Sequence, residues 1–203
     1  MVKKTKQEVV SEFRCAEILD AARSVFARKG FYATTVDEIA ETAGLAKGTL
    51  YLYFRSKRDL YLEALKQGLV ALIEKTRQNL EAAPTAAEKI KAFVSTRIRY
   101  AEENRDFILI YHAEFGNIGR APLKEFRELY LQQAKALEAV LREAAERGQV
   151  PLSRPDAAAF AVYEMTRGLI TQRMLGWSAA TAEEDIDFLS GMIWNGLSRN
   201  GQV

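Results

Sequence analysis

Residues 35–54 read TVDEIAETAGLAKGTLYLYF, and this stretch predicts two short helices joined by a tight turn. Thr35 and Glu38 have the spacing of a capping box, in which each side chain bonds the other residue's backbone N–H. Apolar residues then recur at the helical spacing i, i+3, i+4 and i+7; they are Val36, Ile39, Ala40 and Ala43. Gly44 follows, and glycine most easily adopts the left-handed conformation that ends a helix. We therefore expect one helix to end at Gly44 and a second to follow it.

The second helix is expected to turn an unusual set of side chains outward. Spacing places Leu45, Leu50 and Phe54 on its buried side. The outward set combines a positive charge, a hydroxyl, a glycine and two aromatic rings; it consists of Lys47, Gly48, Thr49, Tyr51 and Tyr53. Such a helix could lie in the major groove of DNA, with its N-terminal residues against base edges. An ordinary helical hairpin with a solvated face would also fit this spacing.

A longer motif around this stretch favours the DNA-binding interpretation. It reads Phe26-x-x-x-Gly30-Phe31-x-x-Thr34-Thr35-Val36-x-x-Ile39-Ala40-x-x-Ala43-Gly44-x-x-Lys47-Gly48-Thr49-Leu50-Tyr51-x-Tyr53-Phe54-x-Ser56-Lys57-x-x-Leu60. This pattern closely resembles the DNA-binding domain of the TetR family of one-component bacterial repressors, over roughly residues 13–65. Leu52 is a small departure, because many members carry a tyrosine or another polar residue there. It bears on base preference rather than on the binding mode.

The distribution of charge agrees with contact to DNA. The formal net charge of the 203 residues is only +2, but residues 42–58 contain four basic side chains and no acid. Clustered positive charge beside a helix-turn-helix is typical of phosphate contact. Free backbone N–H groups at the start of a helix also favour a phosphate. The predicted DNA-binding residues are Thr34, Thr35, Val36, Ala46, Lys47, Gly48, Thr49, Tyr51, Tyr53 and Lys57.

Composition predicts an all-α protein of about nine helices. Hydrophobic residues make up 48% and charged residues 28%, as in soluble globular proteins, and only four prolines occur. No run approaches 18 uncharged apolar residues, so no membrane span is expected. The N-terminus lacks the apolar core of a signal peptide, and the single Cys15 cannot form an intramolecular disulfide. These features predict a cytoplasmic protein.

The helical pattern divides into two expected domains. Residues 1–56 are expected to form a three-helix, helix-turn-helix DNA-binding domain that begins with a basic arm at residues 1–10. Residues 57–203 are expected to form a helical bundle for effector binding and dimerisation. Helix signals within these domains occur at about 13–29, 57–81, 86–103, 107–111, 122–148, 155–175 and 181–197. The helix at 57–81 is expected to link the two domains mechanically.

The last two helices are apolar on most sides, so each is expected to pack against other helices on more than one side. They can form a homodimer interface as a four-helix bundle, or they can be buried in the core of a monomer. A helix-turn-helix needs two copies to read a pair of half-sites, which favours the homodimer.

Aromatic side chains are frequent in the second domain, and an aromatic stripe of this kind is often plain core. The TetR resemblance implies instead a small-molecule cavity among the fifth to eighth helices. The predicted ligand-binding residues are Phe93, Arg97, Tyr100, Phe107, Tyr111, Phe115, Phe126, Tyr130, Tyr163 and Arg167. A long-chain acyl-CoA or fatty acid and a planar drug-like or aromatic molecule are both candidate effectors.

Signals for catalysis or metal binding are missing from the sequence. His112 is the only histidine, and no glycine-rich phosphate loop or clear acid–base pair of carboxylates occurs. We expect no enzymatic activity, no metal and no cofactor. The resemblance implies a homodimeric repressor of a palindromic DNA operator that a small hydrophobic effector releases. A non-specific DNA binder and a ligand-sequestering protein remain as alternatives, and activation in place of repression stays open.

Overall fold

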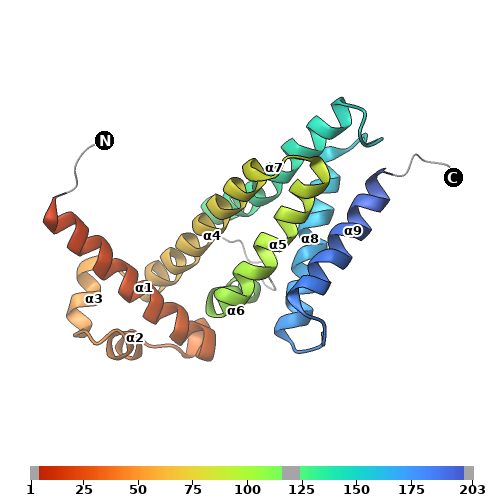
Figure 1. The fold of residues 1–203 in the computed structure, drawn as a ribbon. Helices are drawn as coiled ribbons and strands as arrows, with labels where there is room; N and C mark the ends of the chain where they lie inside the picture. Colours follow the sequence, from red (N-terminus) through yellow and green to blue (C-terminus); the bar gives the residue numbers. More distant parts are fainter. Residues whose placement is uncertain (1–4, 116–123, 199–203) are drawn as a thin grey trace. The chain divides into compact units, whose positions relative to one another are not determined.

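The computed structural model describes residues 5–115 and 124–198, apart from the side chains of residues 6, 7, 114, 115 and 124–127. Over these ranges the chain forms nine α-helices and no strand (Figure 1), which confirms the predicted all-α fold. The helices are α1 (Lys6–Ala33), α2 (Val36–Thr42), α3 (Lys47–Tyr53), α4 (Lys57–Ala82), α5 (Ala86–Glu103), α6 (Arg105–Phe115), α7 (Lys124–Glu146), α8 (Pro155–Met174) and α9 (Ala182–Ser198). None of these described helices has both the length and the apolar character needed to cross a membrane.

The helices pack into two compact units. The first is built from α1, α2, α3, α6 and the part of α4 up to Gly68. The second is built from the rest of α4 together with α5, α7, α8 and α9. The first unit extends beyond residue 56, where the domain boundary was expected, and it includes α6. The division into a DNA-binding and an effector-binding domain stays a prediction.

Helix α1 is longer than the sequence pattern indicated. It begins at Lys6, because Thr5 and Glu8 form a capping box that we did not predict. Residues 6–10 are therefore helical rather than part of a basic arm. Near its other end the helix is interrupted at Gly30, where φ is +74°, and one further turn extends to Ala33. In the first unit α1 packs against α2 and α6.

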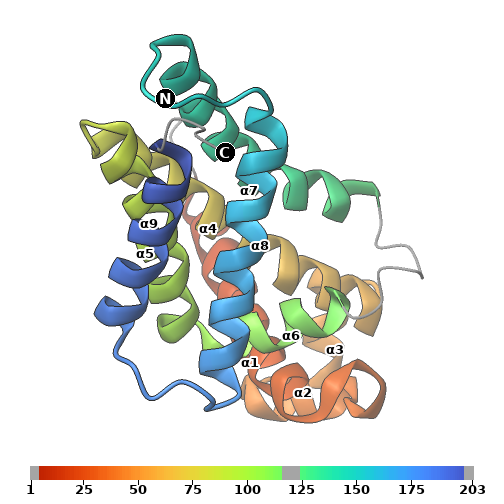
Figure 2. The same cartoon turned by 90° about the vertical axis from the view of Figure 1, so that its right-hand side faces the viewer.

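In the second unit the helices lie side by side in pairs. Helix α5 runs beside α9, and α7 runs beside α8 (Figure 2). The predicted ends of α5, α8 and α9 agree with the structure to within about two residues. Gly116 and Gly119, expected to end the helix at 107–111, and Pro122, expected in the first turn of the next helix, lie outside the described residues.

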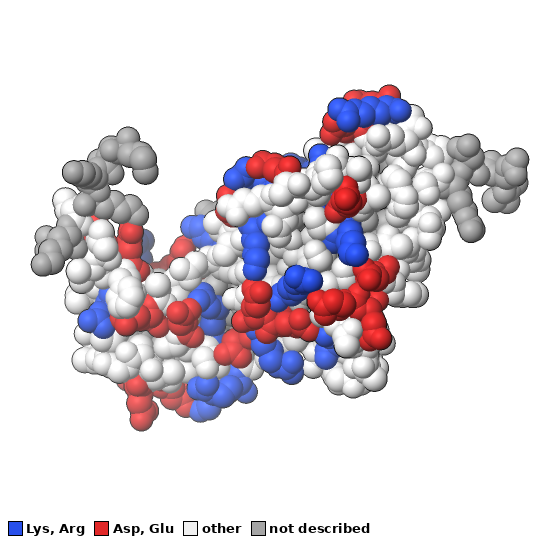
Figure 3. All heavy atoms as spheres, in the orientation of Figure 1, with Lys and Arg blue, Asp and Glu red and all other residues white. Residues whose placement is uncertain are grey.

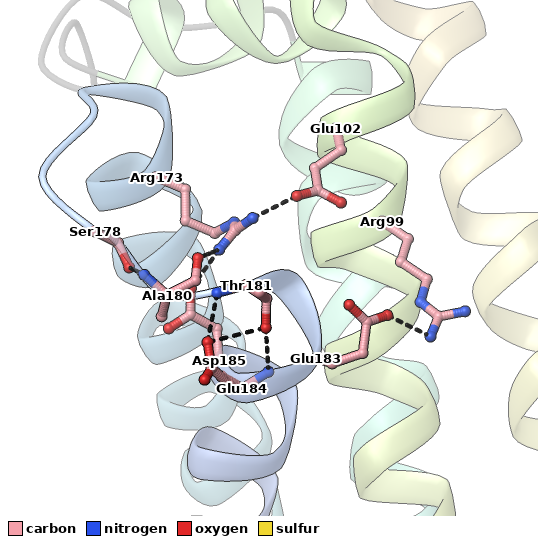
Figure 4. A network of polar contacts seen from close by, with 9 residues as sticks. All are labelled: Arg99, Glu102, Arg173, Ser178, Ala180, Thr181, Glu183, Glu184 and Asp185. Atoms are coloured by element: carbon pink, nitrogen blue, oxygen red, sulfur yellow. Dashed lines mark hydrogen bonds and ion pairs between the residues drawn. The ribbon is translucent and has the colours of Figure 1, made fainter.

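A polar network fixes the start of α9 against its neighbours (Figure 4). Arg173 of α8 donates to the Asp185 carboxylate at 2.6 Å and to the Ala180 carbonyl at 2.9 Å. The same guanidinium forms an ion pair with Glu102 of α5. Thr181 and Glu184 form a capping box at the same point. Three helices of the second unit are thus joined by side chains around one arginine.

Acidic and basic side chains alternate on the face drawn in Figure 3. Exposed ion pairs also join helices of the second unit, such as Lys91 with Asp187 at 2.5 Å and Arg99 with Glu183 at 3.0 Å. Both pairs join α5 to α9. Exposed pairs of this kind stabilise a fold only slightly, so the apolar core must supply most of the stability.

Candidate nucleic-acid interface and effector site

Helices α2 and α3 form the predicted helix-turn-helix. The Thr35 hydroxyl accepts from the Glu38 N–H at 3.3 Å, and the Thr35 N–H donates to the Glu38 carboxylate at 3.0 Å. Hydrogen bonds from Lys29 and from the Thr35 backbone lower the pKa of Glu38 to about 2. Gly44 has a φ of +65°, and the Leu45 N–H closes the turn onto the Ala40 carbonyl at 2.9 Å. The capping box and the left-handed glycine predicted from the sequence are thereby confirmed.

Apolar side chains hold the two short helices in place. Ile39 and Ala40 of α2, Leu50 of α3 and Phe54 just after it are all buried. The predicted inward face of both helices is therefore confirmed, while Leu45 is half-buried.

The outward face of α3 carries the side chains expected from the sequence. Ala46, Lys47, Gly48 and Tyr51 are exposed, whereas Thr49, Tyr53 and Val36 of α2 are half-buried. The Lys47 ammonium forms an ion pair with the Asp37 carboxylate of α2 at 2.8 Å. The hydrogen bond to Asp37 raises the pKa of Lys47, so its charge is retained at neutral pH.

Leu52 also lies on the exposed face of α3, although the sequence had marked it only as a departure from the TetR pattern. Its side chain is 83% exposed. It follows Thr49 by three residues and Gly48 by four, a spacing that places all three on one side of α3. That spacing was the signal available in the sequence. An exposed leucine here suits an apolar contact with a thymine methyl group.

Two of the predicted DNA-binding side chains form hydrogen bonds within the first unit. Thr34 is 1% exposed, and its hydroxyl donates to the Gly30 carbonyl at 2.7 Å. The half-buried Lys57 donates to the carbonyls of Phe31 and Thr34, at 2.8 Å in each case. Its ammonium also lies 4.6 Å from the centroid of the Phe31 ring. These contacts argue that both side chains hold the connection between α1 and α2 rather than contact a duplex.

A buried guanidinium marks the candidate effector site in the second unit. Arg97 of α5 is 3% exposed, and its Nη1 atom donates to the Gln133 side-chain carbonyl of α7. Its central carbon lies 4.2 Å from the ring centroid of Tyr163 on α8 and 5.5 Å from that of Phe93. The Nε atom is buried and has no hydrogen-bond partner among the residues that the structure describes. We refer to Phe93, Arg97, Gln133 and Tyr163 as the Arg97 cluster.

A second set of polar side chains adjoins this cluster. The Tyr130 ring meets the Tyr163 ring edge-on, with 4.9 Å between centroids. The Tyr130 hydroxyl donates to the Glu164 carboxylate, which also accepts from Arg167 Nε at 2.8 Å. Burial and the hydrogen bond to Glu164 both raise the pKa of the Tyr130 phenol. The Glu164 carboxylate is therefore already shared by two donors.

The other predicted ligand-binding residues are distributed elsewhere. Phe107 and Tyr111 lie on α6 in the first unit, where their rings stack with centroids 5.6 Å apart. Tyr100 belongs to the second unit, and the Lys75 ammonium lies 6.0 Å from its ring centroid. The side chains of Phe115 and Phe126 lie outside the described part of the chain.

Gln133 is the member of the cluster that the sequence reading missed. It follows Tyr130, a predicted ligand-binding residue, by three positions, so helical spacing already places it on the same side of the helix.

Comparisons with known proteins agree with this arrangement. Residues 18–64 match the model described as bacterial regulatory proteins, tetR family, and residues 83–171 match a tetracyclin repressor-like C-terminal domain. The HTH-type transcriptional repressor KstR2 of Mycolicibacterium smegmatis is 31% identical over 152 residues, which span 74% of this chain and 73% of that protein. The chain belongs to the TetR family.

Other TetR-type proteins resemble the chain over most of its length. The fatty acid metabolism regulator protein of Bacillus subtilis is 24% identical over 177 residues, 87% of this chain and 90% of that protein. The structure of FadR from Bacillus subtilis in complex with stearoyl-CoA gives a TM-score of 0.78 at 22% identity. It covers 90% of this chain and 98% of that one, which shows that the fold is shared.

Membership of the TetR family confirms the resemblance seen in the sequence. It also confirms the general function predicted there, a DNA-binding transcriptional repressor that responds to a ligand. The matched proteins are transcriptional regulators rather than enzymes. The Arg97 cluster lies within the segment that matches the C-terminal domain model.

Proposed function

We propose that this TetR-family protein is a homodimeric repressor that binds a palindromic operator and is released by a small apolar or aromatic effector. The observation that carries the proposal is the outward face of α3 in a helix-turn-helix whose first helix, α2, begins with a complete capping box. A lysine, a threonine and two tyrosines on one short helix combine groups that contact phosphates with groups that contact base edges.

Each side chain of this face has a proposed role. Lys47 exchanges Asp37 for a DNA phosphate, and Thr49 and Tyr51 contact base edges in the major groove. Tyr53 and Thr35 contact the sugar–phosphate backbone. The small residues Ala46 and Gly48 let the start of α3 approach the bases closely.

Exposed apolar side chains on α8 and α9 support a dimer formed by a second copy of the chain. On α9, Phe188 is 65% exposed and Met192, one turn later, is 46% exposed. Met165 of α8 is exposed as well. Large exposed apolar side chains on adjacent helices favour burial in an interface, and a two-fold symmetric dimer would bury them. The two α3 helices of such a dimer would then contact two DNA half-sites whose centres lie about 34–36 Å apart, or a multiple of that distance.

Effector binding is proposed for the second unit, which contains the Arg97 cluster. The ligand must favour a conformation in which the two α3 helices no longer match the groove spacing. A coupling free energy of about 1–3 kcal/mol would change operator affinity about 5- to 150-fold, and DNA would weaken ligand binding by the same factor. Helix α4 contributes residues to both units and is the proposed transmitting element.

Two effector classes follow from the sequence and the relatives. A long-chain acyl-CoA or fatty acid is one, because a fatty acid metabolism regulator and a stearoyl-CoA complex are among the similar proteins. A planar drug-like or aromatic molecule is the other, and the rings of Phe93 and Tyr163 suit it. We place the protein in the cytoplasm, where bacterial DNA is accessible to it.

The test is selection of genomic fragments by the purified protein, followed by titration of one selected operator at physiological salt. A specific dimer should bind this operator about 1,000-fold or more tightly than random DNA. The double variant Phe188→Glu, Met192→Glu should be monomeric in light scattering and should lose operator binding. Equal affinity for random DNA, or a wild-type protein that stays monomeric at micromolar concentration, would overturn the proposal.

A further inference from the structure

The charge of Arg97 has no counter-ion among the residues that the structure describes. Within the described residues its guanidinium makes one side-chain hydrogen bond, to the neutral amide of Gln133, and no carboxylate of the described chain lies within ion-pair distance. A buried cation of this kind is costly unless an anion or further hydrogen bonds compensate it. The faces of Tyr163 and Phe93 compensate part of that cost through cation–π contact.

The carboxylate of Glu164, the residue after Tyr163, already has hydrogen-bond donors of its own. Glu164 accepts from Arg167 and from the Tyr130 hydroxyl. Arg97, Arg167 and Glu164 together therefore carry one positive charge in excess. A single added negative charge would balance the charge of these three described side chains.

The orientation of the guanidinium indicates what kind of anion fits. Its Nη1 atom donates to Gln133, whereas the buried Nε–H has no acceptor in the described part of the chain. A carboxylate binds a guanidinium side-on through two parallel hydrogen bonds, one of which comes from Nε. Aromatic rings on two sides would then lie against the apolar atoms next to that carboxylate.

We propose that the Arg97 cluster binds the carboxylate of the effector, which is an apolar monocarboxylic acid with a fatty or aromatic body. This inference rests on the proposed function and specifies the ligand class for the same site. The phosphates of an acyl-CoA are a poorer match, because several charges would face a cluster that carries only one in excess.

The experiment compares acids with their neutral and CoA derivatives by isothermal titration calorimetry on the full-length protein. The probes are dodecanoate, methyl dodecanoate, dodecanoyl-CoA, 1-naphthoate and methyl 1-naphthoate. At least one of the two acids should bind about tenfold or more tightly than its methyl ester, because only the acid forms charge-assisted hydrogen bonds. Binding of neither acid, equal affinity for acid and ester, or binding of dodecanoyl-CoA alone would overturn the inference.

Variants assign this preference to Arg97. Arg97→Gln should bind acid and ester alike, and Arg97→Lys should keep a preference for the acid with reduced affinity. The matched control Arg142→Gln, which changes an exposed arginine on α7, should behave as wild type. An acid preference that survives in folded Arg97→Gln would overturn the assignment. If that variant does not fold, the wild-type comparison and Arg97→Lys decide the outcome.

Operator binding without ligand separates this inference from the function on which it rests. Protein that binds its operator specifically but shows no acid preference refutes only the carboxylate assignment. Protein that binds no operator refutes the proposed function itself.

Discussion

The Nζ atom of Lys57 lies 2.8 Å from the carbonyl oxygen of Thr34, where the chain passes from α1 into α2. The same ammonium donates to Phe31 and lies over its ring. Lys57 is the first residue of α4. Through it, α4 holds the entrance to the helix-turn-helix in place, so a residue expected to contact DNA has a structural position inside the first unit.

Replacing this ammonium should therefore affect stability and every operator alike. We expect Lys57→Met to lower the free energy of unfolding by about 1–3 kcal/mol, because partly buried carbonyls lose a charged donor. Operator affinity should fall with it, but the slope of log affinity against log salt should stay unchanged. Urea unfolding and fluorescence anisotropy at several salt concentrations measure the two effects.

Lys47→Met is the matched comparison on the exposed face of α3. It should leave unfolding nearly unchanged, weaken binding to all sequences and flatten the salt slope by about one unit. A flattened slope for Lys57→Met would show instead that Lys57 contacts a phosphate directly.

Thr49 should determine sequence preference rather than overall affinity. Thr49→Val keeps the shape of the side chain and removes its hydroxyl, so a base recognised by that hydroxyl loses its partner. Discrimination worth about 1–3 kcal/mol at one base pair should change, measured by competition between the operator and single-base variants. Thr42→Val on α2 serves as the control, because the Thr42 hydroxyl bonds the Glu38 carbonyl. The same proportional loss on every sequence would contradict a base-reading role.

Local signals in the sequence were reliable because neighbouring residues determine them. The capping box at Thr35 and the left-handed turn at Gly44 depend on a few adjacent groups, and both are present. Contacts between residues far apart in the sequence depend on how the helices pack, and they could not be predicted in this way. The sequence indicated a helix at 107–111, but it could not tell that Phe107 belongs to the first unit. The internal contacts of Lys57 likewise join residues 23 and 26 positions away in the chain.

Gly68 allows the Phe107 ring to pack closely against α4. A Cβ atom at position 68 would lie 2.8 Å from Phe107 Cγ and nearer still to two other ring atoms. Alanine is normally favoured over glycine in a helix by about 1 kcal/mol. Here we expect Gly68→Ala to destabilise the protein by about 1–3 kcal/mol, because the buried ring has little room to move. Urea unfolding measures the change.

A second substitution tests this packing explanation. Adding Phe107→Leu to Gly68→Ala makes room for the new methyl group, so the double variant should be more stable than the two single effects predict. A coupling of about 0.5 kcal/mol or more is expected for side chains in contact. Additive effects would show that the cost of Gly68→Ala arises elsewhere.

The capping box of α2 should give the stability of the protein a dependence on acid pH. The pKa of Glu38 falls from an ordinary 4.5 to about 2 in the folded protein, chiefly through Lys29 and the Thr35 backbone. A lowered carboxyl pKa stabilises the folded state above the unfolded pKa, and this contribution is lost as the pH falls toward the folded value. Glu38→Gln should therefore be less stable than wild type at pH 6, and the difference should shrink between about pH 4.5 and 2.

Thermal unfolding of both proteins at half-unit intervals of pH measures that difference directly. Glu41→Gln, an exposed change on the same helix, is the control and should not reproduce the pH-dependent gap. Operator binding at pH 7 should also weaken in Glu38→Gln, because a neutral amide oxygen accepts from the Thr35 N–H less strongly than a carboxylate does and the ion pair with Lys29 is lost. A stability gap that stays constant from pH 6 to pH 2 would mean that Glu38 acts through its shape and not through its charge.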